Sequence, residues 1–391
     1  MKLTFKRHRI LDPLQENLSR KVHLLQILVG PRQVGKTTAI EQLLETWPHP
    51  TLYATADQLA PPDTGFISEN WKQARGLKGE MPLLVIDEVQ KIGHWSDAVK
   101  MLHDEDVRVK RNLRVVLLGS SALMLQRGMK ESLAGRFQLI PCSHWFFPEC
   151  QEAFGWSLNQ FLFYGGYPGA VPFADDFIAW RDYVQNSLLE TVVGRDIPAV
   201  QRVDNPALFR QTLHLACQHP AEIISLQKLV GQLQDRGSIN TLANYLEFLS
   251  AAFLIRPVQK WSSRPLRVRA SSPKLIVQNN ALINALRNVA YPEALSDKVF
   301  YGRLVENTVG AALVNSGEEV YYWNDRDKEV DFVVHRGNKI LAIEVKSGVS
   351  EAGVSGLKTF QARFPGAVAV TVGGEGADMS VEEFLEKPII P

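Results

Sequence analysis

An α/β fold is predicted for the first 150 residues of this 391-residue chain, on three observations. Apolar strands are expected at residues 24–29, 83–86 and 114–118. The first leads into a glycine-containing stretch and a helix, the second ends in two adjacent acids, and the third ends in Gly-Ser. Apolar strands that lead through such loops into helices favour an α/β fold.

The stretch that follows the first strand, residues 30–37, matches the pattern G-x-x-x-x-G-K-[ST] at every position. Gly30 and Gly35 allow successive backbone N–H groups to face phosphate oxygens, and the following helix adds positive charge at its N-terminus. Lys36 is expected to reach the β- and γ-phosphates. The predicted ATP-binding residues are Gly30, Pro31, Arg32, Gln33, Val34, Gly35, Lys36, Thr37 and Thr38.

Polar residues at the ends of the later strands complete the predicted catalytic set. Asp87, together with Thr37, is expected to hold Mg²⁺, and Glu88 is expected to polarise the attacking water. Ser120 or Ser121 is placed to sense the γ-phosphate. Acids at strand ends are also common where a strand simply meets solvent.

Arg136 follows a glycine in the run Leu133–Ala134–Gly135–Arg136. Such an arginine can act as a finger toward a nucleotide in the same or a neighbouring subunit. A surface ion pair explains it equally simply. The sequence leaves both interpretations open.

Composition bounds the remaining possibilities. Hydrophobic residues make up 45% of the chain and the formal net charge is +1, so any nucleic-acid surface must be local. The three cysteines have no zinc-site spacing. No apolar run approaches the roughly 18 residues that span a bilayer. We therefore expect a cytoplasmic protein with no membrane partner.

The middle of the chain is predicted to be helical. Residues 154–197 have the pattern of a helical lid, in which Arg195 and Asp196 form either a second nucleotide sensor or a structural ion pair. Three short helices and a strand between 206 and 261 resemble a winged-helix module. The third of these helices, from about 240 to 251, has no Arg or Lys, which counts against reading of DNA bases.

A basic segment follows, from residue 256 to residue 274, with no Asp or Glu. Such a segment is expected to neutralise DNA phosphates; the alternative is a solvated loop. We define this basic segment by its cationic residues, which are the predicted DNA contacts: Arg256, Lys260, Arg264, Arg267, Arg269 and Lys274.

The C-terminal region is predicted to have the element order αβββαβ. Glu306 lies on the helix, Asp331 on the second strand, and Glu344 and Lys346 on the third. This Asp…Glu-x-Lys arrangement is that of the restriction-endonuclease-like fold, in which carboxylates hold Mg²⁺ against a phosphodiester. The fold also occurs as a DNA-binding or docking platform, so cleavage stays open.

The chain resembles prokaryotic AAA-type ATPases with a C-terminal domain of unknown function 4143. The resemblance rests on 30–38, 86–91 with Trp95, 119–121, 133–136, 190–197 and the last hundred residues. It implies a ring in which one subunit's arginine completes its neighbour's site. Asn279 departs from the family pattern, which usually has aspartate there.

Four domains are expected. They are an AAA-type ATPase core at 1–150, a helical lid at 151–200, a winged-helix-like module at 201–272 and a restriction-endonuclease-like domain at 273–391.

Three functions remain open. The first is a Mg²⁺-dependent ATPase that binds and remodels or translocates DNA, for example in branch migration, as an oligomeric ring. The second is an ATP-gated DNA endonuclease. The third is a nucleotide-switched protein-interaction module with slow turnover.

Overall fold

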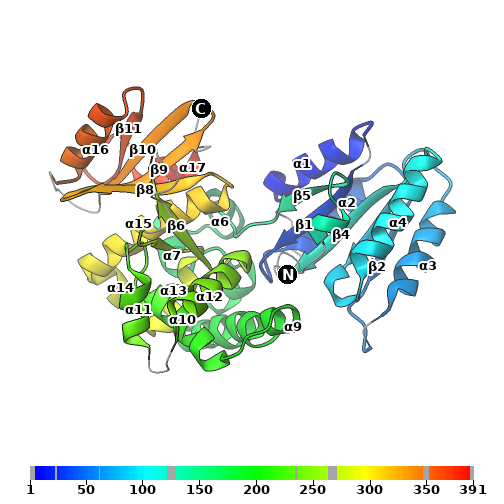
Figure 1. Ribbon diagram of the computed structural model, residues 1–391, viewed down its shortest axis with the longest axis horizontal. Helices are drawn as coiled ribbons and strands as arrows, with labels where there is room; N and C mark the ends of the chain where they lie inside the picture. Colours follow the sequence, from blue (N-terminus) through cyan, green and yellow to red (C-terminus); the bar gives the residue numbers. More distant parts are fainter. Residues whose placement is uncertain are drawn as a thin grey trace. The chain divides into compact units, whose positions relative to one another are not determined.

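The computed structural model describes residues 5–22, 24–60, 62–120, 129–233, 237–262, 271–346 and 352–387. The chain divides into two compact units. Unit 1 comprises Met1–Ser143 with Ala199–Gln201, and unit 2 comprises His144–Pro198 with Arg202–Pro391. Figure 1 draws unit 1 in blue to cyan and unit 2 from green to red.

Unit 1 alternates strands and helices. Its elements are α1 (His8–Ser19), β1 (Leu25–Gly30), α2 (Lys36–Thr46), β2 (Thr51–Thr55), α3 (Thr64–Arg75), β3 (Leu83–Asp87), η1 (Val89–Lys91), α4 (Trp95–Arg108), β4 (Arg114–Ser120), α5 (Met129–Ser132) and β5 (Phe137–Pro141).

The five strands form a sheet in the order β2-β3-β4-β1-β5, and every neighbouring pair is parallel. The register pairs Gly30 with Ser120 and Thr55 with Asp87. The last residues of β1, β2, β3 and β4 therefore lie together along the edge formed by the carboxyl ends of the strands. This edge is where ligands bind in open α/β sheets.

The core of unit 1 explains why the strands read as continuous apolar runs. Helices α3 and α4 pack side by side on one face, where Trp71 is fully buried and Trp95 and Val99 join the same cluster. Strands covered by helices on both faces need apolar side chains in both directions. All six residues of β1 are accordingly buried.

Unit 2 begins with a helical region. Its elements are α6 (Phe147–Phe154), α7 (Leu158–Tyr164), η3 (Pro168–Phe173), α8 (Phe177–Asp182), the π-helical η4 (Tyr183–Leu189) and η5 (Val192–Asp196), α9 (Ile197–Val200), α10 (Pro206–Gln218), α11 (Leu226–Gln232), α12 (Ile239–Ala251), α13 (Asn280–Arg287) and α14 (Tyr291–Ser296). The last two residues of α9 belong to unit 1.

The remaining elements of unit 2 surround a mixed sheet. They are β6 (Ile255–Lys260), β7 (Lys274–Val277), α15 (Lys298–Asn315), β8 (Val320–Asp325), β9 (Lys328–Arg336), β10 (Lys339–Lys346), α16 (Ala352–Arg363), β11 (Val368–Gly373) and α17 (Val381–Glu386).

The sheet of unit 2 has the order β11-β10-β9-β8-β6-β7. Helix α15 packs on the face that carries Phe332 and Ile343, and α16 on the face that carries Val333 and Ala342. The element order α15-β8-β9-β10-α16-β11 is the predicted αβββαβ order. The β6–β7 hairpin, predicted as a wing, extends this same sheet by pairing β6 with β8.

No helix in the described part of the chain is long and apolar enough to cross a membrane.

Candidate functional site

The loop between β1 and α2 has the backbone conformation that its glycines allow. Gly35 has a φ of 86°, and Gln33, at 57°, is also left-handed. A Cβ on Gly30 would collide with the backbone carbonyl oxygen of Cys142. Glycine is therefore needed at position 30 for space and at position 35 for conformation.

Lys36 lies folded over this loop. Its Nζ donates to the backbone carbonyls of Gly30, at 3.0 Å, and Pro31, at 2.6 Å. Burial lowers the pKa of this ammonium, whereas Cys142, Glu88 and Asp87 act in the opposite direction. The side chain thus occupies the space in front of the loop where phosphate oxygens are predicted to bind.

The Asp87 carboxylate lies beside the loop and accepts three hydrogen bonds. Its Oδ2 accepts from the Thr37 hydroxyl at 3.1 Å and from the Tyr53 hydroxyl at 2.8 Å. Its Oδ1 accepts from the N–H of Glu88 at 2.7 Å. Burial and the bond to Asp87 raise the pKa of Tyr53. The predicted metal ligands Thr37 and Asp87 are therefore adjacent.

Glu88 begins a tight turn with a φ of 54°, a strained conformation for a residue with a side chain. Its carboxylate accepts a hydrogen bond from the Gln90 amide. The same amide lies 3.3 Å from the Ser120 hydroxyl at the end of β4. The structure thus links Glu88 to Ser120 through Gln90. Ser121 lies outside the described residues.

Three residues that the sequence analysis did not select contribute to this site. Tyr53 and Gln90 make the contacts above. Arg7 is buried, and its Nη1 donates to the backbone carbonyls of Val34, at 3.1 Å, and Ser143, at 3.2 Å. Arg7 therefore ties the phosphate loop to the segment that follows β5.

Arg136 lies at the end of the sheet where β1 and β5 begin, opposite to the end that carries the phosphate loop. It immediately precedes β5, and its backbone carbonyl accepts from the N–H of Leu25 at the start of β1. Its guanidinium makes two bonds to the Asp104 carboxylate, at 2.6 and 3.0 Å. The predicted ion pair is thus present, and Arg136 lies at the end of the sheet opposite to the phosphate loop.

In unit 2, the predicted nuclease residues Glu306 and Asp331 lie close together. Between them lies the Lys274 ammonium, 2.6 Å from Glu306 Oε1 and 2.9 Å from Asp331 Oδ1. Glu344 is on the neighbouring strand, where burial and then Asp331 raise its pKa to about 8. No group of three His, Cys, Asp or Glu side chains in the described ranges is arranged to hold a metal ion.

Lys346 ends β10, where its charge contributes to a lowered pKa at Asp378. Hydrogen bonds from the N–H and hydroxyl of Thr371 are the larger causes of that shift.

The prediction that Lys274 contacts DNA is wrong. Its side chain is fully buried, so its charge is used inside the protein. Arg256 is exposed on β6, and Lys260 ends the same strand half-buried. The other predicted contacts lie outside the described residues: Arg264, Arg267 and Arg269. Arg195, the predicted second sensor, is exposed on η5, and Asp196 is buried.

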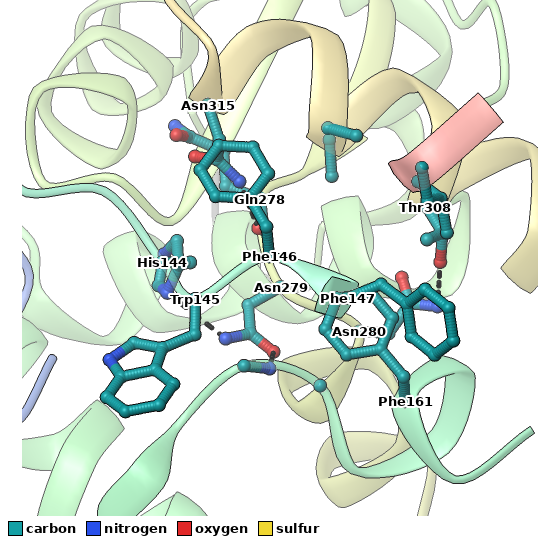
Figure 2. Close-up of a pocket in the computed structure, with 15 residues that line it drawn as sticks. His144, Trp145, Phe146, Phe147, Phe161, Gln278, Asn279, Asn280, Thr308 and Asn315 are labelled. Atoms are coloured by element: carbon teal, nitrogen blue, oxygen red, sulfur yellow. Dashed lines mark hydrogen bonds between the residues drawn. The ribbon is translucent and has the colours of Figure 1, made fainter. Parts of the chain in front are cut away.

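Asn279 lies beside a small cavity of about 30 Å³ in unit 2, shown in Figure 2. Its Oδ1 accepts from the N–H groups of Ala281, at 3.1 Å, and Gly166, at 3.2 Å. Its Nδ2 lies 3.1 Å from Nδ1 of His144. Asn279 therefore caps α13 and holds the chain at Gly165–Gly166.

Three families match separate parts of the chain. Residues 23–150 match the AAA domain, residues 155–293 a domain of unknown function (DUF8612), and residues 301–387 a domain of unknown function (DUF4143). The first and last matches confirm the resemblance that the motifs indicated.

Relatives with similar sequences occur in bacteria and archaea. An uncharacterized protein of Mycobacterium tuberculosis is 26% identical over 84% of this chain and 72% of its own length. One from Methanocaldococcus jannaschii is 24% identical over 81% of this chain and 73% of its own length.

Two solved structures are more distantly similar. Cdc6p of Pyrobaculum aerophilum is 12% identical, with a TM-score of 0.34, over 73% of this chain and 94% of that one. A RuvB variant of Thermotoga maritima is 17% identical, with a TM-score of 0.33, over 66% of this chain and 94% of that one.

Proposed function

We propose, on the premise that this chain joins an AAA domain at 23–150 to a DUF4143 domain at 301–387, that it is a Mg²⁺-dependent ATPase whose turnover is coupled to DNA. One observation carries the ATPase part. The side chains of Lys36, Thr37 and Asp87 gather at the edge of a parallel sheet where its strands end.

Lys36 is the residue that exchanges partners when ATP binds. Its Nζ is bonded to two backbone carbonyls, which are weaker partners for a cation than phosphate oxygens. The β- and γ-phosphates therefore take Lys36 away from Gly30 and Pro31. The N-terminus of α2, which begins at Lys36, adds a favourable partial charge behind them.

The donors Thr37 and Asp87 fit Mg²⁺, because both offer hard oxygen atoms and they already lie 3.1 Å apart. Mg²⁺ bound there with ATP supplies charge neutralisation at the β- and γ-phosphate oxygens. The Tyr53 hydroxyl donates to the same Asp87 Oδ2 and therefore competes with Mg²⁺ for that oxygen.

Glu88 is the residue that orients the attacking water. Its bond to Gln90 holds the carboxylate near Ser120, at the end of the neighbouring strand. A γ-phosphate contact to Ser120 would be transmitted to Glu88 through this amide. Gln90 is thus a positioning residue for the water-activating carboxylate.

Arg136 acts, in this proposal, on the nucleotide of a neighbouring subunit in an oligomeric ring. Its place before β5 keeps it away from the loop of its own chain. The ion pair with Asp104 is partly exposed, so a phosphate from a neighbouring subunit could reach this guanidinium and replace the carboxylate as its partner.

DNA coupling rests on the basic segment defined above, without Lys274. Arg256 and Lys260 are its described members, and both lie on β6. Their charges offer contacts to phosphates rather than to base edges, so we expect binding that depends on DNA shape and salt.

The first experiment compares Lys36→Ala with the wild type in nucleotide binding and turnover. Lys72, exposed on α3, gives the matched control Lys72→Ala. Loss of turnover in the Lys36 variant alone supports the proposal. Unchanged affinity and turnover in that variant would refute the ATP site.

The second experiment measures ATP hydrolysis with single-stranded, duplex and four-way-junction DNA at two salt concentrations. Stimulation by one form that weakens with salt supports DNA coupling. A rate that no DNA changes would refute it and favour the nucleotide-switched interaction module.

A further inference from the structure

Unit 2 contains a buried ammonium surrounded by carboxylates from separate elements. The Nζ of Lys274, on β7, is 2.6 Å from Glu306 on α15, 2.9 Å from Asp331 on β9 and 3.4 Å from Glu329 on the same strand. None of the Lys274 side chain is exposed. Glu344, on β10, completes a set that we call the carboxylate cluster: Glu306, Glu329, Asp331 and Glu344.

The members of this cluster are held firmly. Asp331 directs Oδ1 to Lys274, and its Oδ2 accepts from the N–H of Val345 at 2.9 Å. Glu306 also pairs with Arg303 at 3.2 Å on the same helix. The Oε2 of Glu344 is buried without a hydrogen-bond partner in the described part of the chain. One carboxylate oxygen of the cluster is therefore left over.

The cluster keeps Lys274 charged. Burial alone lowers the pKa of a lysine, but the carboxylates of Asp331, Glu306 and Glu329 together hold the pKa of Lys274 above its ordinary value. The ring of Phe332, 4.9 Å from Nζ, adds a cation–π contact. The ammonium is thus a permanent positive charge among these acids.

A divalent metal does not fit this arrangement. A Mg²⁺ ion must approach its oxygen ligands to about 2.1 Å and keeps several waters. The ammonium already contacts Asp331, the aspartate of the Asp…Glu-x-Lys arrangement, and Glu306, the carboxylate that the helix would add to a metal site. A metal between Glu306 and Asp331 would meet the charge of Lys274 at close range, without water to screen it.

We propose that Lys274 is the resident cation of the carboxylate cluster, occupying the position that a divalent metal takes in nucleases of this arrangement, so that the C-terminal domain does not cleave DNA. Its role is then to hold the β7 and β9 strands to α15. The proposal is independent of the ATP site in unit 1, and its failure would leave that site unaffected.

The first test measures Mn²⁺ binding without nucleotide, by paramagnetic resonance of the free ion. All proteins carry Asp87→Asn, which removes the metal ligand in unit 1. We expect Glu306→Gln to leave Mn²⁺ binding unchanged when Lys274 is present. A Mn²⁺ site that Glu306→Gln abolishes in that background would overturn the proposal.

The second test removes the resident cation. Lys274→Met is expected to gain one equivalent of bound Mn²⁺, lost again in the double variant Lys274→Met/Glu306→Gln. A Lys274→Met protein that folds and gains no site would contradict the proposal.

The unfolding midpoint of Lys274→Met gives a separate readout that does not depend on a metal titration. We expect the unfolding midpoint to fall much further in Lys274→Met than in Lys328→Met, which removes a partly exposed lysine from β9. Part of the loss should be recovered when Glu306→Gln removes one of the facing charges. Equal midpoints for the two lysine variants would refute the role of Lys274.

Cleavage is tested directly with the wild-type protein, Mg²⁺ or Mn²⁺, and the three DNA forms. Intact DNA is expected in every reaction. Metal-dependent cleavage that disappears in Glu344→Ala, with ATP turnover retained, would show that the cluster is a nuclease site and end the proposal.

Discussion

Replacing Asn279 tests whether this side chain is a structural cap or part of a ligand site. In Asn279→Ala, the N-terminus of α13 loses its cap and the buried N–H of Gly166 loses its acceptor. A lost cap costs about 1 kcal/mol and a buried unpaired N–H about 1–3 kcal/mol, so we expect a loss of about 2–4 kcal/mol in the free energy of unfolding.

Asn279→Asp is the matched control, because its carboxylate can accept from the same two N–H groups. It loses only the donor that faces His144 Nδ1, which accepts from Asn279 while Nε2 bonds to the carbonyl of Phe253 at 2.8 Å. The negative charge at the start of α13 is favourable. We therefore expect the Asp variant to lie between the wild type and the Ala variant.

The assay is urea denaturation, followed by hydrogen exchange of peptides that cover residues 160–170 and 274–287. This readout reports the affected region of unit 2 by itself. The cap explanation fails if Asn279→Ala changes the free energy of unfolding by less than about 0.5 kcal/mol, the usual range for a surface substitution. It also fails if the Asp and Ala variants are equally destabilised.

Three further predictions use other contacts. Tyr53→Phe removes one donor from Asp87, worth about 1.5 kcal/mol, so half-maximal ATP turnover should need up to about tenfold less Mg²⁺; an unchanged requirement contradicts this. Gly166→Ala places a Cβ against the carbonyl of Trp145 and should cost about 1–3 kcal/mol in urea unfolding, whereas equal stability would mean that the backbone yields freely. The pKa of Glu344 is raised to about 8 in the folded protein, so its contribution to stability is fully present below the pKa of the unfolded chain and is lost as pH rises through 8. The stability of Glu344→Gln should therefore increase relative to that of the wild type between pH 5 and pH 9. A difference in the free energy of unfolding that does not change with pH would contradict this.

The phosphate loop was predictable because its chemistry lies in consecutive residues. The pattern from Gly30 to Thr37 specifies backbone conformation, so it needs no knowledge of distant parts of the chain. The position of Asp87 and Glu88 at the site was also predictable, because the carboxyl ends of parallel strands lie together at one edge of the sheet. Tyr53 was not, because its contact depends on how β2 lies beside β3, which the sequence pattern leaves unspecified.

Lys274 was misassigned for a physical reason. Its neighbours in the sequence are basic and polar, so a local reading treats it as one more solvated cation. Its partners, Glu306 and Asp331, come from later elements that reach it only when β7 joins the C-terminal sheet. A lysine directly before an apolar strand was the available signal, because such a side chain is buried only with partners.

The burial of Lys274 also bounds what DNA binding can look like. Without Lys274, the basic segment has five cationic side chains that could contact DNA. Each phosphate neutralised on duplex DNA contributes about 0.9 to the slope of log affinity against log salt concentration. The logarithm of affinity should thus fall with the logarithm of salt by no more than about 4.5 per subunit. Since α12 carries no Arg or Lys, a steeper slope would require cations outside this segment, and would move the DNA surface to another part of the molecule.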